Sequence, residues 1–433
     1  MNSCDILVLG GGPAGLSAVY TLKNAGVDVQ VYDKNDIPGG LCRSFTIQGF
    51  TFDTFAHVNF CRDEYVLSML ERRTKCITHL PEAYNYSKGI WVRNPVQNNL
   101  YPLDTDEKIN IIKGFISREH FTAPANYKEW LISQYGTYFT ENYPAKYTRK
   151  YWTVEPEYLE PKWVEGRMYA PSIDEVLRGA FETDTPNVHY SKQTSYPENG
   201  GFGSFLRPFE CGCFNGSSEL IGLEINERIA HFKNGNDVKF ERVISTIPLD
   251  ILTDCITDII VPDDVKSAAS QLDFTSGVMV SIALRTQHKS PSLWFYIYDE
   301  DIPPARVYCP DIKSPNNVPN GCSAMQAEIY FSKHKPLNSS LEEIRDRTVE
   351  CMIKMGLFDR EDILFTDVRT EKYANIMFSA SIYTAREKIK AFLNSCGIYC
   401  AGRFGEWDYL WLGQSILSGK RAAEAVIDSR NGV

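Results

Sequence analysis

The glycine cluster near the N-terminus constrains the fold of this chain more than any other feature. It follows a short apolar segment, residues 5–9, and has the spacing G-x-G-x-x-G at Gly10, Gly12 and Gly15. In a strand–turn–helix unit, the first glycine permits a tight turn and the second lets the backbone approach a pyrophosphate. The third lets the helix pack closely on the strand. We therefore expect a strand at 5–9 that leads into a helix ending near residue 24.

A second strand is expected at residues 27–32, and it ends at Asp33. An acidic side chain about 20 residues after the glycines accepts a hydrogen bond from a ribose hydroxyl in dinucleotide-binding domains. The N-terminus of the intervening helix offers free N–H groups and a partial positive charge to the phosphates. The sequence thus predicts an α/β fold with a Rossmann-type dinucleotide-binding domain.

Composition narrows the classes of function. The net charge is −10 and no long Lys/Arg run occurs, so we expect no nucleic-acid partner. The 12 cysteines include no CxxC pair, the 7 histidines show no metal-ligand spacing, and we see no signal peptide. The apolar start of the chain is too short to span a membrane. These features predict a cytoplasmic protein with free thiols, no bound metal and no membrane span.

The residues after Asp33 indicate which dinucleotide is bound. Segment 37–44 carries a glycine doublet followed by an arginine, and segment 49–53 is Gly-Phe-Thr-Phe-Asp. Together with the glycine cluster, these segments resemble the flavoprotein group that includes amine oxidases, protoporphyrinogen oxidase and UDP-galactopyranose mutase. The resemblance implies FAD as the cofactor. The binding residues that it implies are Gly10, Gly12, Pro13, Ala14, Gly15, Asp33, Gly39, Gly40, Leu41, Arg43, Gly402, Arg403 and Gln414.

Later segments resemble other parts of the same FAD-binding domain. Residues 242–248 resemble its closing strand and turn, and residues 398–405 with the amphipathic stretch 417–427 resemble its C-terminal strand, turn and helix. The resemblance implies that this domain is discontinuous, with a helical lobe and a sheet-bearing lobe inserted in it. The ranges are 1–60, 196–260 and 392–433 for the FAD-binding domain, 61–195 for a mostly helical substrate lobe, and 261–391 for a sheet-bearing substrate lobe.

Within that group, several segments resemble UDP-galactopyranose mutase of the eukaryotic type. They are 91–99, 147–152, 166–168, 294–296 followed by Arg306, and 402–409. The resemblance implies an enzyme that interconverts the pyranose and furanose forms of a nucleotide-diphosphate sugar, similar to UDP-galactose, through reduced FAD. It also implies a nucleotide-sugar substrate from polysaccharide biosynthesis and NAD(P)H as an external reductant. Whether the protein forms a homo-oligomer stays open.

The resemblance also assigns roles to single residues. Arg167 and Arg306 would grip the diphosphate through charge-assisted hydrogen bonds, and His57 would lie near the flavin and help to keep it reduced. These three are the implied catalytic residues. The implied substrate-binding residues are Gln97, Trp152, Tyr296 and Tyr409.

The chain departs from the mutase pattern near these residues. Phe55 and Ala56 stand where the pattern has a glycine pair before the histidine. Other substrate-contacting positions also hold different residues, namely Asn94, Val96, Thr148 and Gly413. We expect the fold to tolerate these changes and the base or the sugar to differ from those of UDP-galactose.

Two alternative functions stay open at this point. An amine oxidase or protoporphyrinogen oxidase would use the same fold, but amine oxidases generally keep a lysine on a strand of the substrate lobe. The expected strand, 274–284, contains none. A non-catalytic flavoprotein would keep FAD only for structure, which leaves the paired arginines without a role.

Overall fold

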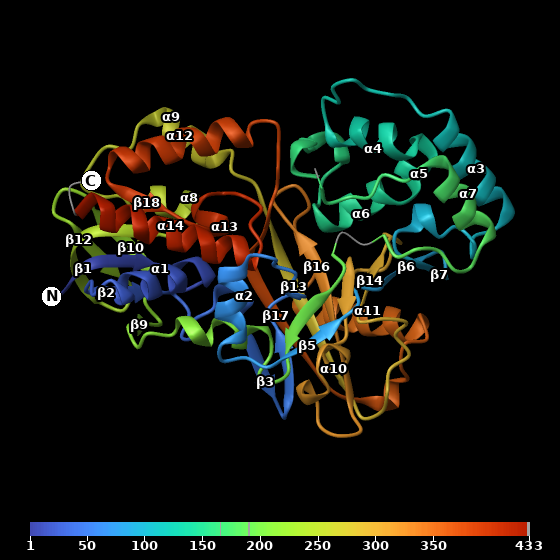
Figure 1. Cartoon of the computed structure of the whole chain (residues 1–433), viewed down its shortest axis with the longest axis horizontal. Coiled ribbons are helices and arrows are strands. Elements are labelled where there is room, and N and C mark those ends of the chain that lie inside the picture. Colours follow the sequence, from blue (N-terminus) through green and yellow to red (C-terminus); the bar gives the residue numbers. More distant parts are fainter. Residues whose placement is uncertain (165, 189–190, 431–433) are drawn as a thin grey trace.

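The computed structural model describes residues 1–164, 166–188 and 191–430 and has three parts (Figure 1). A first sheet with helices on both faces holds both ends of the chain, at the left of Figure 1. A helical lobe lies at the upper right and a second sheet at the lower right. Because the first sheet uses segments that are far apart in the sequence, the other two parts are inserted between its strands.

The first sheet has the strand order β10–β11–β12–β1–β2–β9, and β18 also pairs with β12. The strands β18, β12, β1, β2 and β9 pair in parallel, whereas β10–β11 and β11–β12 pair antiparallel. Their bounds are β1 (Asn2–Leu9), β2 (Val29–Tyr32), β9 (Phe214–Asn215), β10 (Leu220–Glu224), β11 (Ile229–Phe232), β12 (Asp237–Ser245) and β18 (Ile398–Cys400). The sheet and its helices confirm the predicted α/β, Rossmann-type fold.

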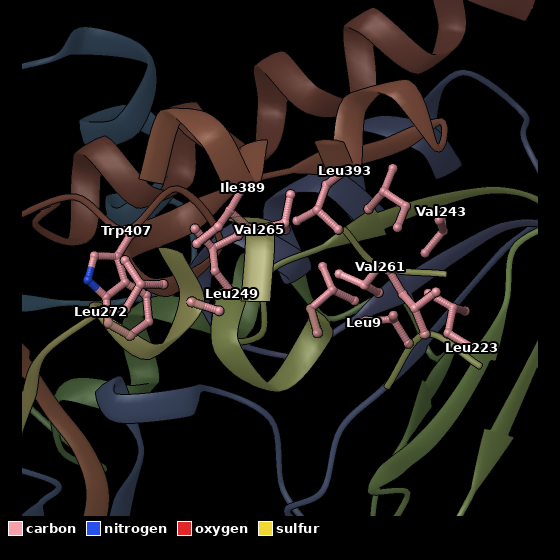
Figure 2. Close-up of a cluster of buried hydrophobic side chains, with 14 of the residues drawn as sticks. Leu9, Leu223, Val243, Leu249, Val261, Val265, Leu272, Ile389, Leu393 and Trp407 are labelled. Atoms are coloured by element: carbon pink, nitrogen blue, oxygen red, sulfur yellow. The ribbon is translucent and has the colours of Figure 1, made fainter. Parts of the chain in front are cut away.

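Side chains of β1 alternate between the two faces of this sheet, with the period of two that a strand imposes. Leu7 and Leu9 are buried with residues of α8 (Leu249–Asp254), α9 (Asp263–Ser270) and α12 (Ile382–Ser395), in the cluster of Figure 2. Ile6 and Val8 are buried with residues of α1 (Pro13–Asn24) and α14 (Leu412–Arg430). Complete burial of each such side chain contributes about 1.5–3 kcal/mol, which fixes β1 between two layers of helices.

The second sheet has the strand order β17–β13–β16–β15–β14–β6–β7. On β13, Val278, Val280 and Ile282 are buried in a core that they share with α11 (Leu341–Lys354). Met279 lies between them in the sequence and belongs to a different core, together with Tyr330. One face of the sheet is therefore a hydrophobic core, and the other faces the helical lobe. The strands are β6 (Ala83–Ser87), β7 (Ile90–Arg93), β13 (Phe274–Leu284), β14 (Trp294–Ile297), β15 (Arg306–Tyr308), β16 (Ser323–Phe331) and β17 (Ile363–Ile376).

Polar side chains cap several helices of the helical lobe. Asp104 accepts a hydrogen bond from Glu107 N at 2.8 Å, Asn126 accepts one from Glu129 N at 3.0 Å, and Ser172 forms a capping box. Such caps satisfy N–H groups that no carbonyl of the helix reaches, so they fix where a helix begins. The helices are α3 (Thr105–Ile116), α4 (Tyr127–Tyr135), α5 (Thr137–Asn142), α6 (Pro144–Tyr151) and α7 (Ile173–Phe181).

The domain boundaries drawn from the sequence remain predictions. Strands of the first sheet fall within 1–60, 196–260 and 392–433, but α9 and α12 cover this sheet and lie largely outside those ranges. The hairpin β6–β7 belongs to the range assigned to the helical lobe and pairs with the second sheet through β14.

Smaller elements join the three parts. They are the sheets β3 (Ser44–Ile47) with β4 (Phe50–Asp53) and β5 (Cys76–His79) with β8 (Thr194–Pro197), and the helices α2 (Glu64–Glu71), α10 (Pro310–Lys313) and α13 (Gly402–Gly405). All 12 cysteines are free. Within the described parts of the chain, no helix is long and apolar enough to cross a membrane. Among the same residues, no group of three or more His, Cys, Asp or Glu side chains is arranged to hold a metal ion.

Candidate active site

A cavity of about 990 Å³ lies where the three parts of the structure meet. The first sheet and α1 contribute Gly10, Gly12 and Asp33 to its wall, and the other two parts contribute Trp152 and Arg306 among others. This volume is at the upper end of the about 300–1,000 Å³ that is common for ligand pockets. The cavity therefore has room for a ligand that extends from the first sheet to the second.

The N-terminus of α1 opens into this cavity. Gly12 precedes the helix, no side chain caps it, and its first turn holds no acidic residue. The uncapped N–H groups need a partner, and a phosphate is the group that a helix N-terminus favours. Gly10 has a φ of +97°, and a Cβ on Gly15 would lie 1.9 Å from the carbonyl oxygen of Gly10. Both glycines are therefore required by the backbone, and the helix end fits the pyrophosphate of FAD.

Asp33 lies beside this helix end. Its Oδ2 accepts a hydrogen bond from Gly11 N at 2.6 Å, and its Oδ1 accepts one from Asn35 N at 2.7 Å. A carboxylate has about four acceptor sites, so capacity remains for a ribose hydroxyl. The position fits the predicted role in cofactor binding.

Two further glycine segments contact the start of α1. A Cβ on Gly40, which has a φ of +55°, would lie 3.1 Å from the Cα of Gly12. A Cβ on Gly402, with a φ of +79°, would lie 2.7 Å from the Cβ of Ala14. Three segments that are remote in the sequence thus converge where the pyrophosphate would bind.

Most of the other residues predicted to bind FAD also line the cavity, namely Pro13, Ala14, Leu41, Arg43 and Arg403. Arg43 forms an ion pair with Glu371. Arg403 Nε donates a hydrogen bond to the carbonyl oxygen of Leu410 at 2.9 Å. Both guanidinium groups are therefore held in place by the protein itself.

Three predicted FAD residues lie outside the cavity wall: Gly15, Gly39 and Gln414. Gly15 acts through the close packing of α1, and Gly39 has a φ of +120° in the turn before Gly40. Gln414 is exposed, and its Oε1 accepts a hydrogen bond from Trp411 N at 3.0 Å, at the start of α14. Here the side chain orders a turn.

His57 lines the cavity with its ring stacked on Phe202 at a centroid distance of 5.0 Å. Its Nδ1 lies 3.1 Å from the carbonyl oxygen of Phe55, so Nδ1 carries the proton. The pKa of His57 is lowered to about 4, chiefly by burial; Asp53 opposes this shift, whereas the charges of Lys313 and Arg403 contribute to it. The imidazole is therefore neutral at pH 7.

Arg306 extends from β15 to the cavity wall, where it meets Glu328 of β16. Glu328 Oε2 lies 2.7 Å from both Nε and Nη2 of Arg306 and accepts a hydrogen bond from Tyr330 at 2.7 Å. Its Oε1 accepts a hydrogen bond from Ala56 N. Burial alone would raise the pKa of Glu328, but Arg306 and these donors hold it below its ordinary value. The carboxylate fixes one edge of the guanidinium and leaves the other edge for a ligand.

Arg167 reaches the cavity from the segment before α7. Its guanidinium carbon lies 4.3 Å from the ring centre of Tyr409 and 4.2 Å from that of Trp411. Its Nη2 donates a hydrogen bond to the carbonyl oxygen of Tyr409 at 3.2 Å. The structure thus brings His57, Arg167 and Arg306 to one cavity, and their catalytic roles remain predictions.

The residues predicted to bind substrate lie in the aromatic part of the wall. Trp152 packs at right angles to Tyr151, with a centroid distance of 5.0 Å. Tyr296 OH accepts a hydrogen bond from Trp294 Nε1 at 3.1 Å, and Gln97 Nε2 donates one to the carbonyl oxygen of Tyr169 at 3.1 Å. The fourth residue, Tyr409, stacks on Arg167. All four line the cavity, and their roles in binding remain predictions.

The sequence reasoning missed two charged groups in or near the cavity wall. Glu328 lies in an otherwise largely apolar strand. An acidic residue in such a strand is unusual, and this pattern could have identified Glu328 as a candidate site residue. Lys313 is fully buried; its Nζ lies 2.9 Å from Asp53 Oδ2 and 3.7 Å from the ring centre of Tyr308. Lys313 is the last residue of the short helix α10, and its surroundings in the sequence give no sign of burial.

Comparison with known proteins supports the same fold. Residues 8–73 match the model of the NAD(P)-binding Rossmann-like domain, and residues 220–427 match that of the flavin-containing amine oxidoreductases. Curated relatives match only locally. A 4,4'-diapolycopene oxygenase of Methylomonas sp. is 48% identical over 56 residues (12% of this chain, 11% of the relative). A zeta-carotene-forming phytoene desaturase of Myxococcus xanthus is 46% identical over 48 residues (11% and 9%). The chain thus aligns with only about a tenth of the length of these relatives.

Solved structures match over nearly the whole chain. A reduced UDP-galactopyranose mutase superposes with a TM-score of 0.91 and 24% identity, covering 98% of this chain and 96% of that one. A putative protoporphyrinogen oxidase from Exiguobacterium sp. 255-15 superposes with a TM-score of 0.73 and 16% identity, covering 98% and 99%. The match of residues 220–427 to a flavin-containing family implies a flavin cofactor. The chain therefore has the fold of UDP-galactopyranose mutase, and its residues 220–427 match the model of the flavin-containing amine oxidoreductases, in line with the sequence resemblance.

Proposed function

We propose that this chain is an FAD-dependent mutase that interconverts the pyranose and furanose forms of a nucleotide-diphosphate sugar. The observation that carries the proposal is the joint placement of Arg167 and Arg306 in one aromatic cavity, which also receives the N-terminus of α1. The planar guanidinium group of arginine binds phosphate groups through paired, charge-assisted hydrogen bonds. A diphosphate between a cofactor site and an aromatic pocket is the ligand that this arrangement suits best.

FAD, bound in its reduced form at the N-terminus of α1, would supply the nucleophilic and redox chemistry of the reaction. Arg306 would bind the diphosphate with the guanidinium edge that Glu328 does not use, and Arg167 would bind it from the helical lobe. The guanidinium N–H groups that the two arginines direct at the diphosphate would stabilise the negative charge that develops as the bond to the sugar breaks. The aromatic walls, including Trp152 and Tyr296, would stack on the sugar or the base and exclude water.

Among the described residues that line the cavity, we find no activated thiol. Cys42 lines the cavity, but burial raises the pKa of its thiol to about 12, so it stays protonated at neutral pH. His57 donates a hydrogen bond from Nδ1 to the backbone carbonyl of Phe55, so its Nε2 is an acceptor. His57 would therefore have a positioning role beside the flavin. The covalent chemistry would therefore belong to the cofactor.

The test is an anaerobic assay of the purified holoenzyme. The flavin is reduced with dithionite or with NAD(P)H, and the enzyme is incubated with a panel of nucleotide-diphosphate sugars; chromatography separates the ring isomers. We expect interconversion of at least one sugar with the reduced enzyme and none with the oxidised enzyme. Conversion by NAD(P)H alone would identify the external reductant. The absence of conversion across a broad panel would contradict the proposal.

The alternative is an oxidase of the amine oxidase or protoporphyrinogen oxidase type, which the match of residues 220–427 favours. An oxidase would release hydrogen peroxide with its substrate, and a mutase causes no net redox change. β13 contains no lysine, and the buried lysine in the cavity wall, Lys313, is engaged by Asp53. Peroxide formation with amines or porphyrinogens would support the oxidase and exclude the mutase as the main activity.

A further inference from the structure

The turn that joins α13 to α14 carries two aromatic side chains that enclose Arg167. The guanidinium carbon of Arg167 lies 4.3 Å from the ring centre of Tyr409 and 4.2 Å from that of Trp411. The ring centres of Tyr409 and Trp411 are 6.4 Å apart. Arg167 comes from the inserted helical lobe and the two rings come from the C-terminal part of the first domain, so this contact bridges two parts of the structure across the cavity.

Aromatic contact fixes a guanidinium in a way that a single ion pair does not. The planar group packs against rings through its faces, while its N–H groups point out through its edge. One of these, Nη2, is directed at the carbonyl oxygen of Tyr409 at 3.2 Å. A guanidinium held in this plane has lost most of its rotational freedom before a ligand arrives, which lowers the entropic cost of binding.

Trp411 is itself held against the domain. Its ring packs at 85° on Phe60 with a centroid distance of 4.5 Å, and its backbone N–H donates to Gln414. The side chain is therefore a fixed wall for Arg167. Tyr409 was expected to bind substrate from the sequence, whereas nothing in the sequence pointed to Trp411.

We propose that Trp411 is a positioning residue that orients Arg167 toward the diphosphate of the substrate. This inference rests on the proposed function, because that function gives Arg167 its ligand. It adds a residue to the binding machinery that acts through the arginine and without contacting the diphosphate.

The first test measures binding of UDP to the oxidised holoenzyme by isothermal titration calorimetry. Trp411→Leu removes the aromatic face, and we expect Kd to rise about tenfold, the effect of losing one well-formed cation–π contact. Trp411→Phe keeps a ring, and we expect it to restore Kd to within about threefold of the wild-type value. Trp91→Leu is the matched control, since Trp91 packs on Phe295 at 5.0 Å and does not line the cavity. We expect the Kd of the Trp91→Leu variant for UDP to equal that of the wild type.

A double-mutant cycle then separates positioning from direct contact. If Trp411 acts through Arg167, adding Trp411→Leu to Arg167→Ala causes no further loss of UDP affinity. An equal tenfold loss in both backgrounds overturns the proposal, because Trp411 would then act independently of the arginine. The absorbance of bound flavin in every variant shows that the holoenzyme has formed.

A second readout needs no ligand. Trypsin cleaves after arginine, and mass spectrometry identifies the cut after Arg167. We expect cleavage after Arg167 to be faster in Trp411→Leu than in the wild type. We expect Trp411→Phe to restore the wild-type cleavage rate. An unchanged cleavage rate in Trp411→Leu would also overturn the positioning role. If cleavage responds as expected but the wild type does not bind UDP, the positioning of Arg167 stands and the proposed function is wrong.

Discussion

Replacing Glu328 with Gln tests how the cavity holds its second arginine. All of the contacts to Glu328 come from donors: Arg306 through Nε and Nη2, Tyr330 through its hydroxyl, and Ala56 through its backbone N–H. A glutamine presents one oxygen and one NH2 group. Whichever way the amide turns, its NH2 group faces a donor, and a buried N–H loses its acceptor.

The expected loss follows from these contacts. A buried donor left without an acceptor costs about 1–3 kcal/mol, and breaking a buried ion pair from one side costs about 3–5 kcal/mol. Glutamine keeps the shape of the side chain and one acceptor, so we expect Glu328→Gln to lower the free energy of unfolding by about 3 kcal/mol.

Glu107→Gln is the matched control. Glu107 is also buried, and it accepts hydrogen bonds from Tyr138 and Tyr143 hydroxyls at 3.0 Å each. A hydroxyl can reverse and accept from the new NH2 group. The ion-pair partner of Glu107, Lys88, has a side chain that is 53% exposed and can turn to water. We therefore expect a loss of only about 1 kcal/mol.

Urea unfolding of the holoenzyme, followed by tryptophan fluorescence, measures both losses. The pH dependence adds a check on the cause. Since the pKa of Glu328 is held below its ordinary value of about 4.3, its contribution is complete above that pH and is lost as the pH falls through the lowered pKa. The stability difference between the wild type and Glu328→Gln should therefore shrink only in acid. Equal losses in the two variants at pH 7 would refute the reasoning.

Three further predictions concern other parts of the cavity. Gly15→Ala would place a Cβ 1.9 Å from Gly10 O, so α1 must shift, and we expect the variant to purify without FAD, as its ratio of flavin to protein absorbance will show. Lys313→Met leaves Asp53 buried without its cation, which should cost about 3–5 kcal/mol in urea unfolding; Lys75→Met, at an exposed ion pair, should cost less than about 1 kcal/mol. The pKa of His57 is lowered to about 4, so the folded state binds fewer protons than the unfolded state and stability should decline as the pH falls from about 6.5 to about 4. His57→Gln should remove that decline, and a decline of the same size in this variant would mean that another group causes it.

The dinucleotide-binding half of the site could be predicted from the sequence because its geometry is local. The glycines at 10, 12 and 15 fix a turn and a helix start within a few residues, and the structure has that turn and an uncapped helix N-terminus at the predicted place. The match at 402–405 extended the prediction to the far end of the chain. There the resemblance supplied what spacing alone could not, namely that this segment returns to the cofactor site; in the structure Gly402 lies against Ala14.

The substrate half of the site could be predicted only in part, because its geometry depends on contacts between distant strands and loops. Glu328 meets Arg306 because β15 and β16 are neighbours in register, with Arg306 opposite Glu328. Nothing in the sequence near either residue states that register. Lys313 ends the short helix α10 and Trp411 lies in the turn before α14, and tertiary packing sets the direction of both segments. Gln414, which the resemblance assigned to FAD, lies exposed in the first turn of α14 and outside the cavity wall, and its role in FAD binding stays a prediction.

The charges in the cavity show that its arginines would contribute in different ways. Arg306 shares a buried space with Glu328, so the pair carries little net charge and would bind a diphosphate mainly through the direction of its remaining N–H groups. Arg43 is likewise paired with Glu371. Arg403 instead donates to the carbonyl of Leu410 and lies 5.1 Å from the ring centre of Tyr409, and it forms no ion pair with any carboxylate among residues 1–164, 166–188 and 191–430. A partly buried cation without an acid partner attracts a nearby anion, because water screens it less than it would at the surface. Arg403 would thus attract the proposed FAD pyrophosphate by its charge, while Arg306 would provide orientation on the side of the substrate.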